Sequence, residues 1–138
     1  MDVAVVAITV FKDKCLFLKR NFDPKNWSPP CGRLEKEEEP IDGLKREVLE
    51  ETSLEVIPII TVDAKNVLYN KKPLLSISYV CFATSDKVKL SHEHSDYKWI
   101  AIDDLKNIDI DTDFNVDAWP LHIKTAYFYA QEKKISIS

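Results

Sequence analysis

Residues 32–54 read GRLEKEEEPIDGLKREVLEETSL, and this acidic stretch organises the rest of the chain. Pro40 suits the first turn of a helix, because its fixed φ fits there and its missing N–H would have no helical partner. We therefore predict a helix over residues 40–52. Glu50 and Glu51 would then lie in its last turn, near the negative end of the helix dipole, where Lys or Arg would be the stabilising choice. Acids placed against local stability indicate a functional site.

The predicted helix would carry its later carboxylates beside its buried side. At about 100° per residue, one side of the helix is an apolar stripe of Ile41, Leu44 and Val48. Glu51 lies at the edge of this stripe, and Glu47 and Glu50 fan outward from it. Carboxylates held partly out of water are costly unless cations compensate their charge. Several anionic oxygen ligands suit Mg²⁺, Mn²⁺ or Ca²⁺ rather than Zn²⁺, so we favour a metal site over a solvated acidic face.

Length and composition limit the other classes of function. The chain has 138 residues, 45% of them apolar and 30% charged, which fits one globular domain over residues 1–138. Its net charge is −4 and it has no long basic tract, so we expect no stable DNA or RNA binding. The longest apolar run, residues 3–11, is too short to span a bilayer, and Asp2 lies where a signal peptide would be positive. Three widely spaced cysteines indicate reduced thiols, and we expect a cytoplasmic protein that is a monomer or a homodimer.

Hydrophobic periodicity predicts the remaining elements. The predicted strands cover residues 3–11, 15–19, 54–64, 74–84 and 97–101, the first two as a hairpin. Residues 21–31 carry three prolines and are predicted as a loop. We predict a brief helical turn at residues 103–105 and a second helix over residues 115–133, with Pro120 in its first turn. This order of elements predicts an α/β fold in which helices cover a central mixed β-sheet.

The acidic stretch resembles the Nudix box, whose family pattern is G-x5-E-x7-R-E-U-x-E-E-x-G-U, with U an apolar residue. Its fixed positions before the last Gly are occupied here by Gly32, Glu38, Arg46, Glu47, Glu50 and Glu51. Ser53 replaces the last Gly, just past the helix, where a left-handed cap is expected. Segments at residues 16–20, 27–30, 97–100 and 103–105 also resemble the family, so the resemblance covers most of the chain. It implies a Nudix-type (MutT-like) α/β/α sandwich.

The resemblance also implies a reaction. Nudix enzymes hydrolyse a nucleoside diphosphate linked to another group, by attack of water on phosphorus with divalent metals such as Mg²⁺ or Mn²⁺. A nucleoside triphosphate, a dinucleoside polyphosphate, a nucleotide sugar and ADP-ribose all remain open as substrates. The main alternative is a catalytically idle Nudix-fold module that only binds nucleotides, although such a module would usually lose a box Glu. An isomerase of isoprenoid diphosphates and an RNA-decapping enzyme fit the length and charge less well.

Roles for individual residues follow from the same resemblance. The implied metal ligands are Glu47 and Glu51, with Glu50 as ligand or catalytic base, Glu38 for a further metal, and the backbone carbonyl of Cys31. Arg46 joins Glu50 and Glu51 in the catalytic group, and Arg46 can bridge to Glu50 or to Glu38. A Cys31 thiol acting as a nucleophile is disfavoured, because no His lies near it in sequence and water is the expected attacker.

A polar loop at residues 90–94 holds weaker candidates. The family often places a further carboxylate in this region, as base or metal ligand, and Glu93 is the candidate here. His92 and His94 have no third soft ligand at a matching spacing, so we predict both to be exposed to solvent. Residues 109–113 imitate the opening of a calcium loop but lack the required Gly and final Glu, so we exclude calcium there.

Residues for the substrate come from the segments before the helix. Lys19 and Arg20 end a strand near the predicted site and can reach phosphates, and Phe22 can stack on a base. Gly32 is one of only two glycines in the chain, so we expect either a close backbone approach or a positive φ there, with a simple turn as the alternative. Further aromatic candidates for stacking are Trp27, Tyr69, Phe114 and Trp119.

Overall fold

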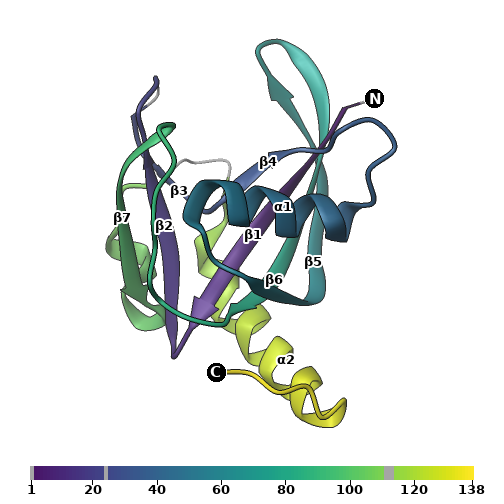
Figure 1. Cartoon of the computed structure of the whole chain (residues 1–138), viewed down its shortest axis with the longest axis vertical. Helices are drawn as coiled ribbons and strands as arrows, with labels where there is room; N and C mark the ends of the chain where they lie inside the picture. The colour runs from purple at the N-terminus through teal and green to yellow at the C-terminus, as the bar shows by residue number, and fades with distance from the viewer. Residues whose placement is uncertain (1, 24, 111–113) are drawn as a thin grey trace.

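A mixed β-sheet with one helix on each face forms the fold (Figure 1). The computed structural model of the chain describes residues 2–23, 25–110 and 114–138. Its strands are β1 (Asp2–Phe11), β2 (Lys14–Arg20), β3 (Trp27–Ser28), β4 (Cys31–Arg33), β5 (Val56–Tyr69), β6 (Lys72–Ala83) and β7 (His94–Ala101). Its helices are α1 (Pro40–Thr52), η1 (Ile102–Asn107), η2 (Val116–Ala118) and α2 (Trp119–Glu132). The predicted α/β/α sandwich with a central mixed sheet is confirmed.

Strand β1 is the centre of the sheet, whose order is β3-β2-β1-β6-β5. It runs parallel to β6 along most of its length and antiparallel to β2 only at its end, where Val10 pairs with Cys15. Nearer its start β1 pairs with β4 instead, with Val5 opposite Gly32. One edge of β1 is therefore shared between β2 and β4. This arrangement places Gly32 of β4, the first residue of the acidic stretch, beside α1.

Alternating side chains of the strands fill two cores. On the α1 side, Val5 and Ala7 of β1 pack with Leu44 and Val48, both fully buried. On the other side, the next residues of β1, such as Ile8, pack with the apolar face of α2. The predicted apolar stripe of α1 is thus confirmed for two of its three members. Ile41 is 39% exposed, because it lies in the first turn, where α1 extends beyond the edge of the core.

The predicted elements differ from the observed ones at the start of α2, at the short strands β3 and β4, and in the length of the β5–β6 hairpin. Helix α1 has the predicted bounds, and the predicted turn at 103–105 lies within η1. Helix α2 begins at Trp119 rather than at residue 115, because a separate turn, η2, precedes it. The loop prediction for residues 21–31 missed β3 and the start of β4. The calcium pattern excluded at residues 109–113 falls partly outside the described residues.

Strands β5 and β6 form a hairpin that is longer than predicted. Pairing continues to Tyr69 opposite Lys72, across the two-residue turn Asn70-Lys71. Both turn residues have positive φ, at 50° and 63°, which is the geometry that joins twisted strands most tightly. The turn lacks the usual Gly, so Asn70-Lys71 is only a weak hairpin signal. Among the described residues, no helix is both long and apolar enough to cross a membrane.

Candidate functional site

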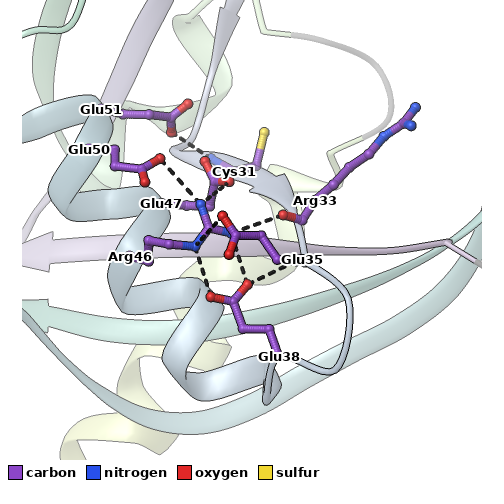
Figure 2. A network of polar contacts seen from close by, with 8 residues as sticks. All are labelled: Cys31, Arg33, Glu35, Glu38, Arg46, Glu47, Glu50 and Glu51. Atoms are coloured by element: carbon purple, nitrogen blue, oxygen red, sulfur yellow. Dashed lines mark hydrogen bonds and ion pairs between the residues drawn. The ribbon is translucent and has the colours of Figure 1, made fainter.

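Arg46 donates hydrogen bonds to three glutamates and forms a longer ion pair, at 3.7 Å, with a fourth, Glu35 (Figure 2). Its Nε and Nη2 donate to the two carboxylate oxygens of Glu38, at 2.8 and 2.9 Å. Its Nη1 donates to Glu47 at 2.9 Å and to Glu50 at 3.2 Å, and Nη2 also reaches the carbonyl oxygen of Arg33 at 3.1 Å. The bidentate hydrogen bond from Arg46 lowers the pKa of Glu38 to about 2, so Glu38 is ionised. Both of its carboxylate oxygens accept hydrogen bonds from Arg46. The predicted bridges from Arg46 to Glu38 and to Glu50 are both present.

Glu51 is the buried carboxylate of the site, with 6% of its surface exposed. Its Oε1 accepts a hydrogen bond from the backbone N–H of Cys31 at 3.1 Å. Burial, followed by the charge of nearby Glu47, raises the pKa of Glu51 to about 9. Without a cation Glu51 is therefore protonated at neutral pH, and a bound divalent cation would displace that proton.

Glu47 packs directly on the backbone of Gly32. A Cβ added to Gly32 would overlap the carboxyl group of Glu47. The predicted close approach at Gly32 is confirmed, whereas the alternative of a positive φ is wrong, since no described glycine has one. Burial also raises the pKa of Glu47, against the lowering effect of Arg46. Position 32 must therefore lack a side chain for Glu47 to lie where it does.

Ser53 ends α1 in the left-handed conformation predicted for this position. Its φ is 64°, and its N–H donates to the carbonyl of Leu49 at 2.9 Å. Its hydroxyl donates to the carbonyl of Lys89 at 3.2 Å, a bond that glycine cannot make. The N–H of Lys89 in turn donates to the carbonyl of Thr52 at 2.9 Å. The departure from the family pattern therefore ties the helix end to the loop that follows β6.

The loop between β6 and β7 places Glu93 and His94 beside Glu51 of α1. The N–H of Ser91 donates to the backbone carbonyl of Glu51 at 3.2 Å. From the other side, the N–H of Asn21 donates to the carbonyl of Glu93 at 3.0 Å. Atoms of Glu51, Glu93 and His94 that can bind a metal all lie within 4.8 Å of one another. Two carboxylates and an imidazole at this spacing fit a divalent cation.

The prediction that His94 is exposed is wrong, whereas His92 is exposed as predicted. Only 8% of His94 is exposed, and its Nδ1 has no hydrogen-bond partner among the described residues. Burial lowers the pKa of His94, so its ring is neutral near pH 7. His94 pairs with Arg20 across an irregularity in the β2–β7 ladder. Such a shift in register leaves no mark in a single sequence, so sequence reasoning missed this residue.

A cleft of about 540 Å³ opens beside these residues, on the α2 side of the sheet. Arg20, Phe22 and Gly32, predicted to contact substrate, line it together with Cys31. Arg20 is held by a hydrogen bond from its Nη1 to the Asn26 side chain, at 2.9 Å. Lys19 does not line this cleft. Its ammonium lies 5.9 Å from the ring centre of Trp27, so its role toward phosphate stays a prediction.

The lining of the cleft also contains residues that sequence reasoning did not assign. Arg33 and His122 line it, and the guanidinium of Arg33 stacks 5.1 Å from the ring centre of Tyr69. Tyr69 and Trp119, two of the further aromatic candidates, are also in the lining. Nothing in the local sequence around Arg33 or His122 distinguishes them from ordinary surface residues. The lining of the cleft therefore combines acidic, basic and aromatic side chains.

Comparisons with known proteins agree with this architecture. The family model described as NUDIX domain matches residues 1–120. The chain is 27% identical over 95 residues to the asymmetrical bis(5'-nucleosyl)-tetraphosphatase of Rattus norvegicus, an alignment that covers 64% of this chain and 65% of the rat protein. It is 30% identical over 99 residues to the protein of the same description from Caenorhabditis elegans, covering 67% of this chain and 71% of that protein.

Solved structures show the same fold. The MutT protein of Methanosarcina mazei superposes with a TM-score of 0.75 at 24% identity, covering 89% of this chain and 93% of that one. A Caenorhabditis elegans Ap4A hydrolase superposes with a TM-score of 0.67 at 22% identity, covering 94% of this chain and 97% of that one. At these identities the structural likeness shows the fold alone, whereas the family model covers most of the sequence.

Proposed function

The chain belongs to the Nudix family of pyrophosphohydrolases, and from this premise we propose that it cleaves a diphosphate bond in a nucleoside diphosphate linked to another group. The observation that carries the proposal is the buried Glu51, which lies with Glu93 at one end of the 540 Å³ cleft. A cleft of this size suits a small ligand such as a nucleotide. The proposal takes residues 1–138 as one domain, and the three reduced cysteines suit a reducing compartment such as the cytoplasm.

The donor set of the site fits Mg²⁺ or Mn²⁺. Glu47 and Glu51 would hold the cation, and Glu50 and the backbone carbonyl of Cys31 are the further ligands that we propose. Burial, with a smaller contribution from neighbouring carboxylates, raises the pKa values of Glu47 and Glu51, and a cation would offset this cost of ionising them. When bound, the metal supplies charge neutralisation for the diphosphate and a lower pKa for water.

The surrounding residues have separate tasks in this proposal. Arg46 is a positioning residue, because its contacts hold Glu47 and Glu50 in place. Glu38 orients Arg46 through the two-pronged bond, and this contact favours orientation over the role of metal ligand. Glu93 lines the cleft beside Glu51, where it would serve as a metal ligand or accept the proton of the attacking water.

For the substrate, we propose a dinucleoside polyphosphate as the first compound to test. Two curated relatives are described as asymmetrical bis(5'-nucleosyl)-tetraphosphatases. In the cleft, Arg20 lies near the carboxylates and can pair with phosphate, and the exposed ring of Phe22 offers a face on which a base can stack. Nucleoside triphosphates, nucleotide sugars and ADP-ribose complete the panel.

The test compares wild type, Glu51→Gln and Glu55→Gln on this panel with Mg²⁺ or Mn²⁺. Glu55 is exposed, so its variant is a matched control for loss of one carboxylate. We expect wild type and Glu55→Gln to hydrolyse at least one compound, and Glu51→Gln to be slower by at least about 100-fold. Full activity in Glu51→Gln would overturn the assignment. Nucleotide binding without turnover in any protein would favour the alternative, an idle binding module.

A further inference from the structure

The imidazole of His94 has an unusual environment for a buried side chain. A buried polar atom is normally hydrogen-bonded, and one left without a partner costs free energy. The Nδ1 atom of His94 is such an atom among the described residues, although only 8% of the residue is exposed. A histidine that merely filled the core would be expected to have a partner. The other ring nitrogen, Nε2, is the one that faces the most buried carboxylate of the site, Glu51.

The distance between these two side chains suits an atom bound between them. Nε2 of His94 lies 4.0 Å from Oε2 of Glu51, which is too long for a hydrogen bond. Metal–nitrogen and metal–oxygen bonds to such ligands are each about 2.0–2.2 Å. A metal bound to both atoms can therefore span a separation of up to about 4.2 Å. Glu93 is the third donor: its ligand atom lies within 4.8 Å of the other two, and rotation of its exposed side chain would bring the carboxylate onto the same ion.

We infer that His94, Glu51 and Glu93 form a mixed nitrogen–oxygen site that binds a first-row transition-metal ion, such as Co²⁺ or Zn²⁺, more tightly than Mg²⁺. Imidazole is a good ligand for transition ions, whereas Mg²⁺ prefers oxygen ligands and water. The sequence alone indicated oxygen ligands only, and the buried imidazole changes that donor set. The inference rests on the proposed function for its catalytic meaning, but metal binding itself is measured without turnover.

The first experiment measures affinity in the chain stripped of metal. Calorimetric titrations with Co²⁺ and with Mg²⁺ are compared for wild type, His94→Gln, His92→Gln and His122→Gln. We expect Co²⁺ to bind wild type at least about 10-fold more tightly than Mg²⁺, and His94→Gln to lose about 10-fold or more of the Co²⁺ affinity. The exposed His92 and the cleft residue His122 are matched controls, and their variants should bind Co²⁺ as wild type does. Equal Co²⁺ affinity in His94→Gln and wild type would overturn the inference.

A second measurement needs no variant and so does not depend on how a variant folds. Pulsed electron paramagnetic resonance of the wild-type chain with bound Mn²⁺ detects directly coordinated nitrogen. We expect one coupled imidazole ¹⁴N, and a spectrum without it overturns the inference. Nitrogen coupling without hydrolysis of any substrate would uphold this metal site and contradict only the proposed function. Hydrolysis without nitrogen coupling would support the proposed function and contradict this metal site.

Discussion

Replacing Glu51 by Gln should make the metal-free protein more stable while it removes activity. Glutamine has nearly the same shape and can still accept the hydrogen bond from the N–H of Cys31. It carries no charge, however, and the site around residue 51 leaves only 6% of the side chain in contact with solvent. In wild type, folding at neutral pH instead requires the buried carboxylate to take up a proton or to bind a cation, and both requirements disappear in the variant.

The size of this cost follows from the raised pKa. Glu51 has a pKa of about 9 in the folded protein, against 4.5 for a glutamate exposed to solvent, as in the unfolded chain. A raised pKa stabilises the folded state fully below about pH 4.5, and this contribution is lost progressively as the pH rises toward 9. Each unit of pH in that window costs about 1.4 kcal/mol, so the loss by pH 7 reaches about 3 kcal/mol. Because Gln does not titrate, its variant lacks this slope.

Urea unfolding in EDTA at pH 5 and at pH 7.5 measures the effect. We expect Glu51→Gln to exceed wild type by about 1–3 kcal/mol in the free energy of unfolding at pH 7.5, and by much less at pH 5. Mn²⁺ should raise the melting temperature of wild type and not that of the variant. A variant no more stable than wild type at either pH would refute the argument from burial.

Three further substitutions test the geometry around this residue. Gly32→Ala should displace the Glu47 carboxyl and weaken Mn²⁺ binding about 10-fold or more in calorimetry, with an unchanged circular dichroism spectrum; wild-type affinity would contradict the close packing. Ser53→Ala keeps the positive φ and loses the bond to Lys89, so its free energy of unfolding should be about 1 kcal/mol lower than that of wild type. Ser53→Gly also loses the bond but relieves the backbone strain, so its free energy of unfolding should stay near that of wild type. An alanine variant more stable than the glycine variant would exclude this account. Arg46→Lys cannot make a two-pronged bond and should lower the free energy of unfolding by about 1–3 kcal/mol in urea; retention of full stability would mean that the network contributes nothing.

The parts of the fold that local chemistry determines were predictable from the sequence. Pro40 set the start of α1, and the unfavourable acids of its last turn, including Glu51, marked the site. Strands β3 and β4 were not predictable, because segments of two and three residues exist only through pairing with β2 and β1. Their formation depends on partners distant in the chain, which periodicity does not reveal.

The same distinction holds within the site. The fan of Glu47, Glu50 and Glu51 follows from the repeat of one helix, so sequence spacing was enough to place them together. The burial of His94 depends on the register between β7 and β2, where an irregularity falls between Lys19 and Arg20. A shift of one residue in such a ladder reverses which side a residue faces. Residues placed by pairing between strands therefore had to be found in the structure.

The bonds between the end of α1 and the loop after β6 also make that loop a reporter of the site. The amide protons of Lys89 and Ser91 are donated to the carbonyls of Thr52 and Glu51. These amides can exchange with deuterium only when the bonds to the helix end open. Their exchange rates would thus record, under native conditions and without any substrate, how often Glu51 and the segment that carries Glu93 separate.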